Sequence, residues 1–242
     1  MGLIIRENIE QYMQELKDWL VQTANATPEE MSSFFTERID GYEDHMSVWK
    51  RAYGRFAQLL PGWCKNLLDL GCGTGLELDG IWKCSPDIAV TGVDLCQSML
   101  DKLLEKHPDK KLTVVCQDYF QYDFGANQWD GVISFESLHH FLPEKKEMLY
   151  KKIYHCLKSG GIFLLGDYIA CCQEEEDLLR QTCLEKRKQY EVPEEEFIHF
   201  DIPLTLEHEE ELLHKAGFEQ VRAVESIDGA VILIAEKQNK NF

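Results

Sequence analysis

Short, largely apolar runs alternate with amphipathic stretches through the middle of the chain. Runs of this kind predict strands buried on both faces, and at least three of the four gaps between them carry the periodicity of helices. Strands separated by helices form parallel sheets that are covered on both sides. The five runs occupy residues 67–70, 88–93, 112–116, 131–135 and 162–165.

The two ends of the chain carry different patterns. Residues 1–62 have apolar positions at helical spacing and no strand signal, with one helix expected to start after Thr27 and another over residues 43–60. Residues 171–216 are expected to form a long acidic helical stretch. Two further runs, 218–224 and 230–235, are joined by a short link and predict an antiparallel hairpin.

Together these patterns predict an α/β fold with seven strands. A chain of 242 residues fits one domain of the larger kind. Within it we expect an N-terminal helical lid, a ligand-binding core, an acidic helical lid insertion and a C-terminal hairpin. Their expected bounds are residues 1–62, 63–170, 171–217 and 218–237.

Charge excludes some functions. Aspartate and glutamate number 43 against 25 lysines and arginines, so the formal net charge is −18. Such a surface repels phosphate backbones and anionic lipids, so nucleic acid and membrane surfaces are not expected partners. Half of the excess lies in residues 170–217, and we expect its acidic runs to be solvated helix faces.

Location and thiol chemistry follow from the same composition. No apolar run is long enough for a signal peptide or a membrane span, which predicts a cytoplasmic protein. The nine cysteines form no Cys-x-x-Cys pair, so we expect reduced, mostly buried thiols and no bound metal.

A glycine-rich loop follows the first strand. The sequence Asp69-Leu-Gly-Cys-Gly-Thr-Gly75 leads from a buried strand into a helix that is expected to start near Leu76. Glycines permit a tight turn and let a ligand approach free backbone N–H groups. The dinucleotide fingerprint would require a glycine at position 76, and the carboxylate of Asp69 disfavours a pyrophosphate. The loop therefore favours a cationic ligand.

Polar side chains follow the next three strands. Asp94 ends the second strand and is placed to bind the hydroxyl groups of a ribose. Asp118 follows the third strand, with Asp123 as an alternative, and Glu136 follows the fourth. Because parallel strands end at one edge of a sheet, these groups are expected to surround one ligand.

With these motifs in order, the sequence resembles a class I S-adenosylmethionine-dependent methyltransferase of the small, free-standing bacterial type. The resemblance also includes Trp129-Asp-Gly-Val-Ile-Ser-Phe135 and Leu157-Lys-Ser-Gly-Gly161, and it spans roughly residues 63–170. It implies a Rossmann-like, seven-stranded, mostly parallel sheet with a C-terminal antiparallel hairpin. It further implies S-adenosylmethionine as cofactor and S-adenosylhomocysteine as product.

The resemblance implies a role for each matching position. Asp69, Gly71, Cys72, Gly73 and Gly75 would hold the methionine part of the cofactor. Asp94 would bind the ribose and Asp118 the adenine amino group. Leu95, Met99 and Tyr119 would pack beside the adenine, although Leu95 and Met99 also fit a plain core. Phe135 and Glu136 would line the passage in which the methyl group meets the substrate.

Methyl transfer needs positioning more than acid or base catalysis, because the leaving group departs as a neutral thioether. A base is required only when the acceptor carries a proton, and His139 and His140 are then the candidates. The alternative is that one packs against the sheet and the other caps a helix. Asp167, at the end of the fifth strand, either faces the substrate or caps the next helix, and the cap is favoured.

Substrate choice is expected to reside in the added segments. Tyr42, His45 and Trp49 share a helical face, and Tyr42 and Trp49 are predicted to reach the cofactor. The acidic insertion favours a neutral or cationic small molecule as substrate. We expect methylation on an oxygen or nitrogen atom, and we expect the protein to be a monomer or a homodimer. Two alternatives stay open: a non-catalytic cofactor-binding protein, and a carboxy-S-adenosylmethionine-type enzyme. The second would need basic groups, which Arg38, Lys50, Arg51 and Arg55 offer.

Overall fold

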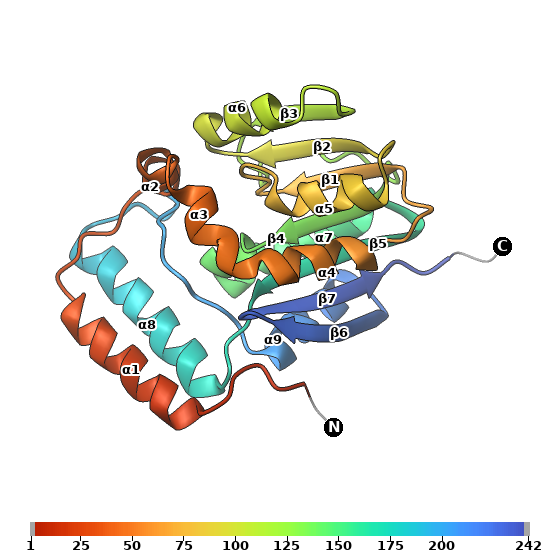
Figure 1. Ribbon diagram of the computed structural model, residues 1–242. Helices are drawn as coiled ribbons and strands as arrows, with labels where there is room; N and C mark the ends of the chain where they lie inside the picture. The colour runs from red at the N-terminus through yellow and green to blue at the C-terminus, as the bar shows by residue number, and fades with distance from the viewer. Residues whose placement is uncertain (1–2, 240–242) are drawn as a thin grey trace.

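The computed structural model describes residues 3–239 and centres on a seven-stranded sheet (Figure 1). Its strand order is β3-β2-β1-β4-β5-β7-β6. The first five strands are parallel, and β7 runs antiparallel to both of its neighbours. The strands are β1 Asn66–Leu70, β2 Ala89–Asp94, β3 Leu112–Cys116, β4 Trp129–Phe135, β5 Leu157–Tyr168, β6 Gln220–Ile227 and β7 Ala230–Glu236. The predicted fold class is confirmed.

Helices cover both faces of the sheet. The helices are α1 Ile9–Gln22, α2 Met31–Arg38, α3 Tyr42–Met46, α4 Lys50–Leu59, α5 Leu76–Cys84, α6 Gln97–Lys106, α7 Pro143–Cys156, α8 Gln173–Gln189 and α9 Leu206–Ala216, with the 3-10 turns η1 Ser47–Trp49 and η2 Leu138–His140. Residues of α4, α5 and α6 form one core with the sheet, and residues of α7 and α9 form another. In β1, Leu67 faces the first core and Leu68 the second, as alternation along a strand requires.

The start of α2 differs from the expected position. Thr27 does not cap a helix, because the helix begins at Met31 and its N-cap is Glu30, whose carboxylate accepts bonds from the backbone N–H groups of Ser32 and Ser33. Residues 29–31 instead bond to the distant residues 197–199: Met31 N donates to Phe197 O, and His199 N donates to Glu29 O, each at 2.9 Å. Tertiary pairing thus overrides the local capping signal.

The predicted acidic helix over residues 171–216 is wrong as a continuous element. It comprises α8, an irregular segment over residues 190–205, and α9. Helix α9 belongs to the core, because Leu212 and Leu213 pack with α7. Figure 1 shows α8 beside α1, away from the sheet, and we call these two helices the helical pair.

Two other expectations need correction. Residues 43–60 form α3, η1 and α4 rather than one helix. The hairpin link is only Asp228 and Gly229, both at positive φ. The acidic runs are not simply solvated, because Glu175, Glu176 and Glu209 are at most 2% exposed and each accepts hydrogen bonds.

The structure also bears on the state of the cysteines and on membrane spanning. All nine cysteines are free thiols, and five of them are buried. Across residues 3–239 no helix combines the length and the apolar character needed to cross a bilayer.

Candidate functional site

The glycine loop between β1 and α5 adopts a backbone that only glycine tolerates well. Gly71, Gly73 and Gly75 have φ values of +74°, +47° and +74°. A Cβ atom at Gly71 would lie 2.1 Å from Ser137 Oγ. The loop is therefore tightly packed against the end of β4, and its glycines are required by shape.

Asp94 ties the glycine loop to the end of β2. One of its carboxylate oxygens accepts a bond from Gly73 N at 2.9 Å, and the other accepts from Cys96 N at 2.8 Å. Burial raises the pKa of Asp94, while these backbone donors lower it. Each carboxylate oxygen keeps a further lone pair for a ligand.

A narrow cavity lies at this carboxyl edge of the sheet, and we call it the inner cavity. Ten of the predicted binding residues line it: Tyr42, Gly71, Gly73, Asp94, Leu95, Met99, Asp118, Tyr119, Phe135 and Glu136. Met31, Ser32, Phe35, Cys96, Ser137, His140, Phe141 and Phe197 complete the lining. The strand ends thus converge as the topology predicts.

Four of the predicted residues do not line the inner cavity: Asp69, Cys72, Gly75 and Trp49. Cys72 is buried against Gly92. A Cβ atom added at Gly92 would lie 2.6 Å from Cys72 Sγ. Gly75 starts α5 and packs against Leu103. Trp49 lines a different cavity, described below.

Asp69 is fully buried behind the loop, beside Glu77 of α5. Apart from a proton shared with Glu77, its carboxylate accepts no hydrogen bond from the described residues. Burial, together with the charge of Glu77, raises the pKa of Asp69 well above its usual range, and burial raises that of Glu77 to about 7. This pair is an uncompensated acidic centre next to the loop.

Asp118, rather than Asp123, lies at the inner cavity. The two residues cap similar turns: Asp118 accepts a bond from Phe120 N at 2.7 Å, and Asp123 accepts one from Gly125 N at 2.9 Å. Only their positions relative to the cavity distinguish them.

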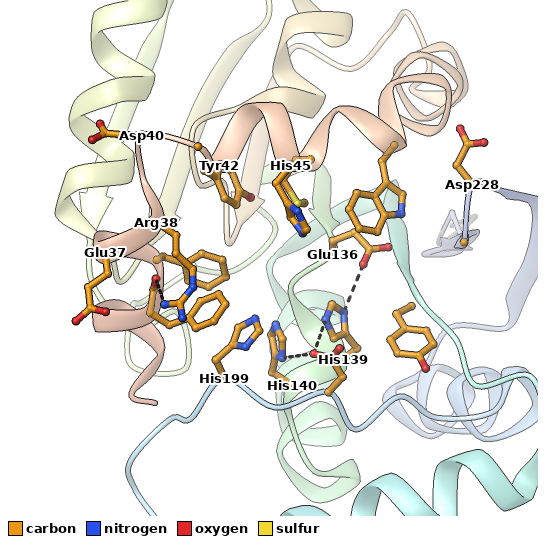
Figure 2. Close-up of a pocket in the computed structure, with 18 of the residues that line it drawn as sticks. Glu37, Arg38, Asp40, Tyr42, His45, Glu136, His139, His140, His199 and Asp228 are labelled. Atoms are coloured by element: carbon orange, nitrogen blue, oxygen red, sulfur yellow. Dashed lines mark hydrogen bonds and ion pairs between the residues drawn. The ribbon is translucent and has the colours of Figure 1, made fainter. Parts of the chain in front are cut away.

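A larger cavity of about 990 Å³, the outer cavity, adjoins the inner one. It carries five aromatic side chains from the N-terminal helices and β5: Phe34, Phe35, Tyr42, Trp49 and Tyr168. Its acidic residues are Glu37, Asp40, Glu136, Asp201 and Asp228, and its basic residues are Arg6 and Arg38. Figure 2 shows Tyr42 and His45 on one side of this cavity and three histidines on the other.

The three histidines are His139, His140 and His199 (Figure 2). His139 Nδ1 lies 2.6 Å from the buried carboxylate of Asp167, and its Nε2 lies 3.5 Å from Asp201 Oδ1. His140 Nδ1 lies 3.2 Å from the same Asp201 oxygen. The dashed lines in Figure 2 mark part of this network.

Burial and charge act oppositely on these groups. Burial lowers the pKa of His139, but the carboxylates of Asp167 and Asp201 outweigh it and hold that pKa well above the usual range. Burial and the neighbouring His139 lower the pKa of His140, and burial lowers that of His199 to about 3. Glu136, at a positive φ of 49°, has its pKa raised by burial to about 8.

Sequence reasoning favoured the wrong role for Asp167 and missed Asp201. Asp167 does not cap a helix, since α8 is capped by Cys172 and the Asp167 carboxylate contacts His139. Asp201 lies in the irregular segment before α9, which we expected to be helical. A Gly-Asp pair closing a buried strand was the available signal for Asp167, and no comparable signal marked Asp201.

The two cavities meet at Phe35, Tyr42, Glu136 and His140, which line both. His139, by contrast, lines only the outer cavity. Ligands in the two cavities would therefore be neighbours, with these four side chains beside both of them.

Part of the chain is similar in sequence to known proteins. Residues 67–161 match the family model of a methyltransferase domain. The chain is 34% identical over 104 residues to a carboxy-S-adenosyl-L-methionine synthase of Campylobacter fetus, which covers 42% of this chain and 44% of that protein. It is 31% identical over 133 residues to phosphoethanolamine N-methyltransferase 2 of Caenorhabditis elegans, covering 53% of this chain and 28% of that protein. The chain thus spans less than half the length of either relative.

Solved structures show the same fold. Human N-acetylserotonin methyltransferase in complex with S-adenosylmethionine superposes with a TM-score of 0.65 at 19% identity, over 91% of this chain and 62% of that one. At this identity the likeness is one of fold.

Proposed function

We propose that the chain is a class I S-adenosylmethionine-dependent methyltransferase that methylates an oxygen or nitrogen atom of a neutral or cationic small molecule, a proposal supported by the methyltransferase-domain match over residues 67–161. The observation that carries the proposal is the meeting of two cavities across Phe35, Tyr42, Glu136 and His140. The inner cavity suits the cofactor and the outer one suits the acceptor. Nine free thiols fit a reducing compartment, and we infer the cytoplasm.

The inner cavity fits S-adenosylmethionine in its chemistry. Asp69 and Glu77 form an uncompensated acidic centre behind the loop, which favours the ammonium group of the methionine part. Gly71 and Gly73 leave the backbone open to close approach, and Asp94 and Asp118 offer oxygen acceptors to the ribose and the adenine amino group. Leu95, Met99 and Tyr119 supply the apolar walls.

When bound, the cofactor supplies an electrophilic methyl group on a sulfonium. The residues of this chain would orient the acceptor and exclude water, which account for most of the acceleration in such a displacement. Glu136 and His140 lie where the cavities meet, and His139 stands behind them with Asp167. We assign His140 and His139 to holding the acceptor atom.

The outer cavity favours a cation or a neutral molecule. Its five carboxylates exceed its two arginines, and Arg38 is already held by both oxygens of Glu29, each at 3.0 Å. Aromatic faces beside carboxylates attract ammonium groups. An amine is therefore a fitting acceptor.

The alternative reaction, formation of carboxy-S-adenosylmethionine, is favoured by the name of the Campylobacter relative. It requires basic groups for an added carboxylate. Of Arg38, Lys50, Arg51 and Arg55, only Arg38 lines the outer cavity, while Arg51 and Arg55 pair with Asp228 and Glu225 near the hairpin turn. The charge of the cavity thus supports methyl transfer. A non-catalytic binding protein would leave the outer cavity without a role.

Cofactor binding can be tested with a matched pair of aspartates. We expect Asp118→Ala to weaken binding of S-adenosylmethionine about tenfold, because one charge-assisted bond contributes roughly 1.5–3 kcal/mol. Asp94→Ala should weaken it about ten- to a hundredfold. Asp123→Ala removes a similar turn cap outside the cavity and should leave affinity unchanged. Calorimetry measures all three, and thermal unfolding shows whether each variant is folded.

Equal affinity of the wild type and both cavity variants would refute the cofactor assignment. The reaction class is tested by incubating the protein with the cofactor and a panel of amines, alcohols and carboxylic acids. Production of S-adenosylhomocysteine with amines or alcohols supports the proposal. A cofactor carrying an extra carboxyl group, detected by mass spectrometry after purification, would establish the alternative.

A further inference from the structure

We propose that His139, His140 and Asp201 form a binding site for a divalent first-row transition metal ion in the wall of the outer cavity. Two imidazoles and one carboxylate are a donor set suited to zinc, iron or cobalt rather than to magnesium or calcium. Their ligand atoms all lie within 4.8 Å of one another. The inference goes beyond methyl transfer and does not depend on the acceptor.

Two distances match metal coordination and are long for charge-assisted hydrogen bonds, although His140 Nδ1 also lies 3.3 Å from Phe200 O, a contact that a bound ion would replace. Asp201 Oδ1 lies 3.5 Å from His139 Nε2 and 3.2 Å from His140 Nδ1. Ligand atoms bound at about 2.0–2.2 Å in a tetrahedral site lie roughly 3.3–3.6 Å apart. A charge-assisted hydrogen bond would be about 2.7–2.9 Å long, close to the 2.6 Å between His139 and Asp167.

A buried carboxylate orients the first imidazole. Asp167 is fully buried and contacts His139 Nδ1, which leaves Nε2 directed to Asp201. Histidines that bind metals usually donate their other ring N–H group to such a carboxylate. Among residues 3–239, the second oxygen of Asp167 and Oε1 of Glu136 are buried without a hydrogen-bond partner, so the cluster keeps free oxygen acceptors.

The charge balance points to a cation. Glu136, Asp167 and Asp201 all approach His139, and in residues 3–239 the ion pairs of these carboxylates are with His139 or His140 alone. A divalent ion would offset the negative charges of Asp167 and Asp201. This compensation matters because isolated charges are costly in a buried setting.

The backbone holds the three ligands together before any ion binds. His139 and His140 lie in η2, immediately after β4, and Asp201 lies in the segment that precedes α9. Ile202 N donates to His139 O at 2.8 Å and joins the two segments. With only three protein ligands, the remaining coordination positions face the cavity and can accept water or an acceptor atom.

The test is metal binding by the full chain after treatment with a chelator. Calorimetry and visible absorption are used to follow titration with Co²⁺ and Zn²⁺, with Mg²⁺ as a comparison. We expect one Co²⁺ per chain with d–d bands, and weak or no binding of Mg²⁺. Asp201→Asn and His139→Ala should lose this binding, and Asp167→Asn should weaken it about 10–100-fold. His45→Ala, in the same cavity, should bind as the wild type does.

Several outcomes would overturn the site. These are the absence of stoichiometric Co²⁺ or Zn²⁺ binding, equal affinity in folded Asp201→Asn, and a thiolate charge-transfer band, which would place the ion on cysteines such as Cys84 or Cys116. Equal or tighter binding of Mg²⁺ would contradict the donor set. A separate measurement distinguishes the two proposals: the affinity of the wild type for S-adenosylmethionine in the presence of chelator. If the wild type does not bind S-adenosylmethionine under these conditions, the methyltransferase proposal fails and the metal site is unaffected.

Discussion

Asp69 and Glu77 are buried side by side, and among the described residues no basic side chain is hydrogen-bonded to either carboxyl. Burial raises the pKa of Glu77 from 4.5 to about 7, and burial with the charge of Glu77 raises the pKa of Asp69 well above its usual range. The folded chain therefore holds a proton that the unfolded chain releases. Between about pH 4.5 and pH 7 the folded state binds more protons, so its stability falls as pH rises through this window.

A variant isolates this effect. Glu77→Gln, without cofactor, should lose less stability between pH 5 and pH 8 than the wild type, because the group with the raised pKa is gone. The difference should be at most about 3 kcal/mol, since one pKa unit corresponds to about 1.4 kcal/mol. Chemical denaturation at both pH values measures it, with exposed Glu105→Gln as control. Parallel pH profiles for wild type and Glu77→Gln would contradict the prediction.

The placement of single residues could be predicted from sequence where a motif marked the strand end, while their roles stay predictions. Asp94, Asp118 and Glu136 reach one cavity because parallel strands end at a common edge. Asp201 was not foreseen, because it comes from an irregular segment whose path depends on contacts with η2 and α2. Asp69 was predicted to lie at the glycine loop. Its burial behind the loop, beside Glu77, follows from packing against α5, which the sequence does not reveal.

At the scale of elements, α7 and α9 are joined by a buried ion pair. Lys146 and Glu209 are fully buried and in contact, and the hydroxyl of Tyr150 donates to the same carboxylate. Removing one partner of such a pair is costly because the other charge remains buried and unpaired.

Lys146→Met should lower stability by about 3–5 kcal/mol and the melting temperature by roughly 10 °C. The double variant Lys146→Met/Glu209→Gln should recover most of this loss, because a neutral amide still accepts the bond from Tyr150. Differential scanning calorimetry measures both variants. Lys151→Met removes an exposed pair with Glu147 and should change stability by less than about 1 kcal/mol. If the double variant were as unstable as the single one, the charge explanation would fail.

Elements were predictable in proportion to how local their signals are. The seven strands follow from apolar runs, and α5 begins where Leu76 indicated. The division of residues 171–216 into α8, an irregular segment and α9 was not predictable. Acidic positions such as Glu176 have helical spacing, yet Glu176 is buried because it accepts a bond from Thr205 N across the fold.

At the scale of the whole molecule, buried polar contacts join α8 to α1 and to the core. Glu175 of α8 accepts bonds from the hydroxyls of Tyr12 in α1 and Tyr168 in β5. The ammonium of Lys186 donates to the carbonyls of Thr23, Ala24 and Ala26, which follow α1. A cation at this helix end also compensates the helix dipole.

Lys186→Met should therefore loosen the connection between α1 and α2. Amide hydrogen exchange over residues 23–30 should accelerate at least about tenfold, which corresponds to about 1.4 kcal/mol, while exchange in β1 and β4 stays unchanged. Lys188→Met, on the exposed side of α8, is the matched control. Unchanged exchange over residues 23–30 would show that Lys186 does not hold this connection.

The pairing of residues 29–31 with residues 197–199 has a consequence for biosynthesis. Helix α2 forms part of the wall of the inner cavity. The segment that holds it in place leaves the ribosome more than 160 residues after it. N-terminal parts of a nascent chain generally begin to fold first. Here α2 must wait, and the inner cavity closes only after residues 197–199 have been synthesised.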